Sequence, residues 1–147
     1  MRKRVEKWLK QYVIYFVYAQ IWAGFFGSLY FSEVLKLPPC VLCTVQRLLL
    51  YPLIIVLSVG IWRRDEDLPW YVLPFSILGI IVAGYHNLIY YHIIPESLTP
   101  CTVQLPCTVR DFTLWGVISI PTMSLVAFIL ITIGIILHDR LRAYRDC

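Results

Sequence analysis

Four apolar stretches, each about as long as a membrane-spanning helix, constrain the fold of this chain more than any other feature. An α-helix rises ~1.5 Å per residue, so ~20 apolar residues cross the ~30 Å hydrocarbon core of a bilayer. Of the 147 residues 59% are hydrophobic, a proportion too high for an ordinary soluble domain. We therefore predict an all-α membrane protein, one integral membrane domain over residues 1–147. Its four-transmembrane-helix bundle spans the lipid bilayer with helices at about 12–31, 44–62, 70–91 and 114–137.

The first apolar stretch follows a basic segment, as the apolar region of a secretory signal peptide also does. It is longer than that region usually is, and no clear small-x-small cleavage site follows it. We therefore expect the stretch to remain as an uncleaved membrane anchor.

Lysine and arginine residues are distributed unevenly between the two sides of the predicted bundle. Ten of the thirteen flank the spans on one side: Arg2, Lys3, Arg4, Lys7, Lys10, Arg63, Arg64, Arg140, Arg142 and Arg145. The loops on the other side, 32–39 and 92–113, carry Lys36 and Arg110. Because cytoplasmic flanks are enriched in these residues, we predict that both termini are cytoplasmic and that both loops face outward. The net charge of +4 is then explained by anchoring near anionic headgroups and indicates no nucleic-acid partner.

Four of the five cysteines lie on the predicted outer side, where disulfides persist. By spacing they form two pairs, Cys40 with Cys43 and Cys101 with Cys107, whereas Cys147 lies on the cytoplasmic side and should stay reduced. The second pair could also be a static staple of its loop. All four thiols could instead bind one zinc ion, but no soluble zinc fold accompanies them, and we predict no metal site.

The first pair stands at the start of the second span, directly after Pro38 and Pro39. A Cys-x-x-Cys at a helix start suits redox chemistry, because one thiol attacks while the other resolves the mixed disulfide. Arg47 follows one helical turn after Cys43 and is the one Lys or Arg inside an apolar stretch, where a charge usually serves function. The helix N-terminus and this cation are both expected to favour the thiolate of Cys43.

Arg47 and His86 are predicted to share one depth just below the outer surface. At ~1.5 Å per residue, Arg47 lies ~6 Å below Cys43 and His86 lies ~9 Å below the outer end of its span. Donors at this depth could bind the carbonyl oxygens of a quinone, a lipid-soluble acceptor of two electrons and two protons. With Gln46 these residues form our candidate quinone-binding set. Two alternatives remain: Arg47 could snorkel to the outer headgroups, and His86 could make a hydrogen bond within the bundle.

The residues around the first pair resemble a known family. Residues 40–47, Cys-Val-Leu-Cys-Thr-Val-Gln-Arg, resemble the Cys-x-x-Cys-x-x-x-Arg signature of the DsbB family, the disulfide bond formation membrane oxidoreductases. Residues 27–33 and 118–121 resemble its Gram-positive branch, disulfide formation protein C (BdbC). The similarity extends across all four spans.

This resemblance implies an enzyme that reoxidises an extracytoplasmic thioredoxin-like thiol oxidase (DsbA-like) and passes the electrons to a quinone, menaquinone or ubiquinone. It implies two redox-active disulfides: Cys40–Cys43 coupled to quinone, with Cys43 next to the ring, and Cys101–Cys107 facing the partner. Arg47 matches the quinone-associated arginine. Gram-negative members have a much longer stretch between the second pair than the five residues here, so which of Cys101 and Cys107 is attacked first stays open.

Two other functions fit parts of the pattern. A vitamin K epoxide reductase-like quinone reductase is also a small helical bundle with a Cys-x-x-Cys, although its active pair usually lies on a late span. A non-catalytic four-span scaffold with structural disulfides would not need Arg47 beside the cysteines. Quinone-dependent oxidation of the outer cysteines discriminates the scaffold from the enzymes.

Overall fold

The computed structural model of the chain describes residues 2–36, 39–94, 113–114 and 118–146. Its helices are α1 (Arg2–Leu29), α2 (Val41–Arg63), α3 (Leu68–Tyr90) and α4 (Ile120–Asp146), and α1 continues as a π-helical turn, η1 (Tyr30–Val34). Within the described ranges, four helices are long and apolar enough to cross a membrane: Gln11–Val34, Val41–Arg63, Leu68–Tyr90 and Ile120–Leu141. The predicted fold class, an all-α four-transmembrane-helix bundle, is confirmed.

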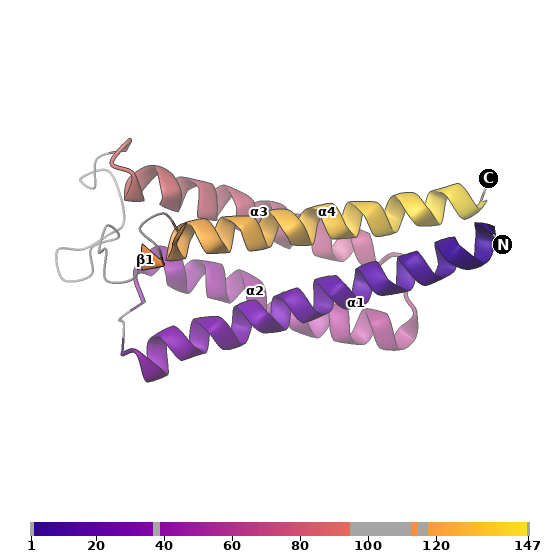
Figure 1. Cartoon of the computed structure of the whole chain (residues 1–147), viewed down its shortest axis with the longest axis horizontal. Helices are drawn as coiled ribbons and strands as arrows, with labels where there is room; N and C mark the ends of the chain where they lie inside the picture. Colours follow the sequence, from indigo (N-terminus) through magenta and orange to yellow (C-terminus); the bar gives the residue numbers. More distant parts are fainter. Residues whose placement is uncertain (1, 37–38, 95–112, 115–117, 147) are drawn as a thin grey trace.

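The helices form an elongated bundle in which α4 packs against α1 and α3, and α2 packs against α1 and α3 (Figure 1). Both termini and the α2–α3 turn lie at one end of the bundle. The start of α2, with Cys40, lies at the opposite end. The end of α1, the start of α2, the end of α3 and the start of α4 therefore lie at one end of the bundle. These helix ends flank the two loops that the charge pattern assigns to the outer side.

Helix α4 begins later than the predicted start at residue 114. Before it, strand β1 (Thr113–Leu114) pairs antiparallel with strand β2 (Ile118–Ser119). Pro121 is the second residue of the helix. Proline suits this place, because the first turn does not need its missing N–H.

The α2–α3 turn shows how the sequence ends one helix and begins the next. Arg64 ends α2 in the left-handed conformation with φ of 52°, and its N–H reaches the carbonyls of Gly60 and Ile61. Asp65 accepts a hydrogen bond from the backbone N–H of Asp67, and Pro69 lies in the first turn of α3. This tight turn holds α2 and α3 as an antiparallel pair.

A continuous apolar core joins the four helices. Its buried members are Ile14, Val17, Ile21, Leu50, Leu53, Leu57, Leu68, Val72, Ala83, Phe128, Ile131 and Ile135. Large apolar side chains also cover the outside of the bundle, for example Leu48, Ile55 and Ile81. An apolar exterior is what a lipid-facing surface requires.

Polar contacts fasten α3 to the start of α4. The Asn87 side-chain amide donates to the carbonyls of Ala83, at 2.8 Å, and Pro121, at 2.9 Å, and its oxygen accepts from the Thr122 hydroxyl at 2.9 Å. The Thr122 hydroxyl is also 2.8 Å from that of Ser119. Because Asn87 directly follows His86, this network holds α3 in place where it meets the cysteine pair.

Close approach of α3 and α4 depends on Gly79. A Cβ added there would lie 2.3 Å from the Phe128 ring, whereas one added at Gly84 would meet nothing within 4 Å. We expect Gly79→Ala to destabilise the bundle by about 1–3 kcal/mol, because a stiff ring must move. Gly84→Ala is the matched control and should be neutral or gain up to ~1 kcal/mol from helix propensity. Denaturant unfolding in detergent, followed by circular dichroism, checks both, and equal midpoints for Gly79→Ala and wild type would contradict the packing argument.

Candidate redox site

The cysteine pair is positioned by the first turn of α2. Cys40 is the N-cap residue with an extended backbone, so its side chain points back over the helix end. The backbone N–H of Cys43 donates to Cys40 Sγ at 3.3 Å, and the two sulfurs lie 2.7 Å apart as free cysteines. Cys40 is buried, with 8% of its surface exposed, and Cys43 is half-buried. The arrangement is a dithiol whose sulfurs are already in contact, so the pair can close into a disulfide with little movement.

His86 on α3 lies against this pair from the side of the bundle core. Its Nε2 is 3.7 Å from Cys40 Sγ, and its Nδ1 is 3.4 Å from the side-chain nitrogen of Gln46. His86 is 1% exposed and Gln46 is buried as well. Because the Gln46 amide donates to Nδ1, the proton of a neutral imidazole sits on Nε2, facing the sulfur of Cys40.

These contacts make Cys40 the thiolate of the pair. The pKa of Cys40 is lowered to about 4, first by the hydrogen bond with the Cys43 thiol and then by His86, against the opposing effect of burial. The helix-end N–H also goes to Cys40. Our expectation that the helix N-terminus makes Cys43 the thiolate was therefore wrong, because the N-cap residue receives the N–H that the sequence argument had assigned to Cys43.

Arg47 links α2 to the end of α1. One guanidinium nitrogen donates to the carbonyl of Ser28 at 2.7 Å and to the hydroxyl of Ser32. These contacts direct the side chain across the bundle to a neighbouring helix. Arginine carries five N–H donors, and the hydrogen bonds to described residues come from one nitrogen, so within the described part of the chain the other N–H groups are available to a ligand.

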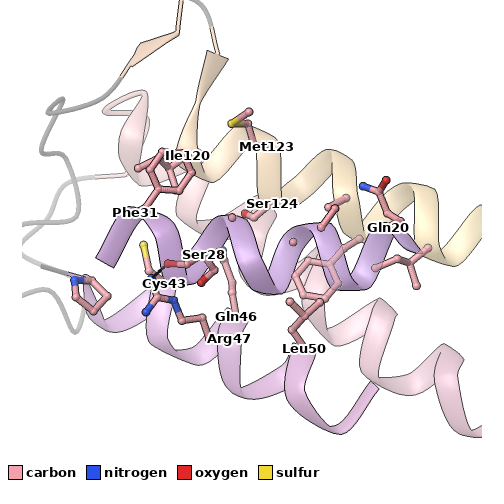
Figure 2. Close-up of a pocket in the computed structure, with 17 residues that line it drawn as sticks. Gln20, Ser28, Phe31, Cys43, Gln46, Arg47, Leu50, Ile120, Met123 and Ser124 are labelled. Carbon is pink, nitrogen blue, oxygen red and sulfur yellow. Dashed lines mark hydrogen bonds between the residues drawn. The ribbon is translucent and has the colours of Figure 1, made fainter. Parts of the chain in front are cut away.

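A cavity of about 380 Å³ lies between α1, α2 and α4, and both Cys43 and Arg47 line it. This volume is in the range of small-molecule sites. Most lining residues are apolar, and the polar ones are Gln20, Ser28, Cys43, Gln46, Arg47 and Ser124. Figure 2 shows Cys43, Arg47 and Ser28 close together at one end of the cavity, with Gln20 toward the other. The site therefore has two sides, with His86 against Cys40 and the cavity against Cys43.

The structure thus joins Cys40, Cys43, Gln46, Arg47 and His86, all of which the sequence singled out. It separates their roles, because Gln46 and Arg47 line the cavity and His86 is not among its lining residues. Sequence reasoning missed Gln20, Ser28 and Ser124 as parts of the cavity wall. A polar residue in mid-span was the available signal for Gln20. Cys101, Cys107 and Cys147 lie outside the described residues.

Comparison with known proteins places the chain in a family. A family model described as "Disulfide bond formation protein DsbB" matches residues 10–138. The chain belongs to the DsbB family. This membership makes it a membrane protein of disulfide bond formation, a thiol–disulfide oxidoreductase.

Individual relatives of the chain are also named as disulfide formation proteins. It is 37% identical over 133 residues to "Probable disulfide formation protein C 2" of Bacillus cereus (strain ATCC 10987 / NRS 248), covering 90% of this chain and 95% of the relative. It is 40% identical over 109 residues to "Disulfide bond formation protein C" of Bacillus subtilis (strain 168), covering 73% and 78%. A "Probable disulfide formation protein" of Chlamydia pneumoniae is 31% identical over 134 residues, covering 91% and 96%. No solved structure matches the chain.

The lowered pKa of Cys40 can be measured in a variant whose other cysteines, Cys101, Cys107 and Cys147, are serines. Ultraviolet thiolate absorbance of the reduced protein should persist as the pH falls from 8 toward about 5, since a thiol is ionised above its pKa of about 4. His86→Ala removes one stabilising contact and should move the loss of absorbance to higher pH. Loss of the absorbance near pH ~8.5, the value of an ordinary cysteine, would contradict the assignment.

Proposed function

We propose that this protein reoxidises an extracytoplasmic thioredoxin-like thiol oxidase of the DsbA type and passes the electrons to a membrane quinone, menaquinone or ubiquinone. One observation carries the quinone assignment: Cys43 and Arg47 line the same cavity, whose volume of about 380 Å³ can admit a ring headgroup. A quinone needs an electron donor and hydrogen-bond donors for its carbonyl oxygens, and these two side chains would supply them. The quinone takes up two electrons and two protons when it is bound there.

The electron path follows from exchange between dithiols and disulfides. The partner dithiol would reduce the Cys101–Cys107 disulfide, and the resulting thiols would reduce the Cys40–Cys43 disulfide. When Cys40 and Cys43 form their disulfide again, they release the two electrons and two protons that convert quinone to quinol. Each step conserves electrons, and no other oxidant is needed.

The residues around the pair would share this work. Cys40, the thiolate, supplies the sulfur that closes the bond with Cys43, which faces the cavity. His86 holds the sulfur of Cys40 in position and keeps a proton at Nε2 next to it. Arg47 would direct its remaining N–H groups to the developing negative charge on the ring oxygens, where a planar, permanently charged donor is effective.

We place both termini in the cytoplasm and the cysteine pair on the extracytoplasmic side of the cell membrane. The end of the bundle that holds both termini and the α2–α3 turn carries ten of the thirteen Lys and Arg residues. Exported proteins acquire their disulfides on the other side, where Cys40 lies under this topology. A multi-pass protein so oriented can receive electrons from a soluble partner outside and pass them into the bilayer.

A cavity-filling variant tests the quinone site. Ala127 lines the cavity, whereas its neighbour Val126 is 50% exposed on the outer surface of α4 and does not line it. Ala127→Phe should raise the KM for quinone by about tenfold or more, because the added ring occupies the cavity and costs ~1.4 kcal/mol of binding for each factor of ten. Val126→Phe adds the same ring toward lipid and should leave the KM near its wild-type value. Quinone reduction by purified protein with a reduced DsbA-like substrate is the assay, and an unchanged KM in Ala127→Phe would place the quinone elsewhere.

A further inference from the structure

The cysteine pair and His86 also have the geometry of a metal site. The sulfurs of Cys40 and Cys43 and a ring nitrogen of His86 all lie within 4.8 Å of one another. The three ligands come from two helices, and two of them follow the Cys-x-x-Cys spacing common in zinc sites. The imidazole ring needs no rotation, because its Nε2 already faces Cys40 Sγ at 3.7 Å. Its proton must move from Nε2 to Nδ1, and the Gln46 amide must turn so that its oxygen, in place of its nitrogen, faces Nδ1.

We propose that the reduced pair and His86 together bind a thiophilic divalent cation, with Zn²⁺ as the physiological candidate, and that this cation blocks the redox pair. Zinc bonds of ~2.3 Å to sulfur and ~2.0–2.1 Å to nitrogen, in a tetrahedral arrangement, place ligand atoms roughly 3.5 Å apart. The 3.7 Å between Cys40 Sγ and His86 Nε2 fits this spacing. The sulfurs, now 2.7 Å apart, must separate by about 1 Å, which a rotation of the half-buried Cys43 side chain can provide.

The fourth coordination position would lie on the cavity side. Cys43 lines the cavity, so a water or an anion can reach a cation held between the two sulfurs. Three protein ligands and one exchangeable position make a site that fills and empties, unlike a closed structural zinc site. Arg47, which lines the same cavity, would favour an anion in that position.

Binding would depend on the redox state of the pair. The cation replaces the thiol proton or protons and is itself neither oxidised nor reduced. A disulfide offers no thiolate, so the oxidised pair cannot form this site. Two thiolates and an imidazole select Zn²⁺ or Cd²⁺ over Mg²⁺ and Ca²⁺, which prefer oxygen ligands. Each bound cation would therefore hold one molecule in its reduced, inactive state until the metal leaves.

Cadmium titration of the quinone-free protein tests this site without any turnover assay. The reduced protein with serine at positions 101, 107 and 147 should bind one Cd²⁺ per chain, with an ultraviolet sulfur-to-metal charge-transfer band, and the same protein oxidised should bind none. His86→Ala should weaken binding by about tenfold or more, because one of three ligands is lost. The matched control is His92→Ala, since His92 is an exposed histidine just past the end of α3 and should leave the affinity unchanged.

Each contrary outcome overturns a stated part of the proposal. No charge-transfer band in the reduced protein, or the same band in the oxidised protein, means that the pair is not a metal site. Equal affinities in wild-type and His86→Ala backgrounds mean that the thiols bind the metal without the histidine. Matching helical circular dichroism spectra for the variants and the parent show that a lost band reflects a lost ligand. Failure of the quinone or partner assignment would leave all these readings unaffected.

Discussion

Replacing Cys43 with serine is expected to lower quinone reduction by about a thousandfold or more, the largest effect of any single change in this chain. The reason is geometric. Cys43 is the cysteine that lines the cavity, and without its sulfur the Cys40 thiolate has no partner with which to close a disulfide. The measurement is quinol formation by the purified variant with a reduced DsbA-like substrate.

Serine substitutions of the two cysteines are expected to have different effects on mixed-disulfide formation. In Cys43→Ser, the Cys40 thiolate keeps its contact with His86 and should attack an incoming disulfide. One sulfur of that disulfide then stays on Cys40 as a mixed disulfide, which non-reducing electrophoresis detects, and the other leaves as a thiolate. Cys40→Ser removes the thiolate of the pair, so less mixed disulfide should form in this variant. Cys147→Ser is the control, because the predicted topology places it across the membrane, and it should retain wild-type turnover. Turnover of Cys43→Ser above about a tenth of wild type would mean that the cavity does not hold the electron acceptor.

Hydropathy was sufficient to predict the bundle, because lipid leaves few choices for an apolar stretch of this length. The start of the fourth helix was missed for a local reason. Residues 114–119 are apolar enough to extend the span, yet β1 and β2 pair there and Pro121 marks the first turn. Hydropathy does not distinguish a short pair of β-strands from the beginning of a helix.

The sequence predicted the part of the site whose residues are close together along the chain. Cys40, Cys43 and Arg47 share one helix, so their spacing placed them together. Which thiol is the anion depends instead on the N-cap geometry and on the rotation of α3 that directs His86 toward Cys40. That rotation is set by tertiary contacts such as those of Asn87, and a single sequence does not contain them explicitly.

The second prediction with a large effect concerns the order of electron flow. Cys101 and Cys107 belong to a polar, proline-containing stretch of the sequence between α3 and α4, which we predict to face a soluble partner. Cys40, by contrast, is buried at the start of α2 and backed by His86. A bulky partner should therefore exchange with the loop pair first, and the loop pair should then exchange with Cys40–Cys43.

The Cys101→Ser/Cys107→Ser variant tests this order with the reduced partner as electron donor. We expect its quinone reduction to fall by about a hundredfold or more, because the partner loses the disulfide that it can reach. A small dithiol such as dithiothreitol is the control donor: it can reach the buried pair directly and should still support quinone reduction by the same variant. If the partner drives wild-type turnover in this variant, Cys40–Cys43 is the direct partner site and the loop pair is a structural staple. The single variants, given the oxidised partner, then separate the two loop cysteines. The remaining thiolate attacks the partner's disulfide, and the cysteine that normally exchanges with the partner should hold it as a mixed disulfide.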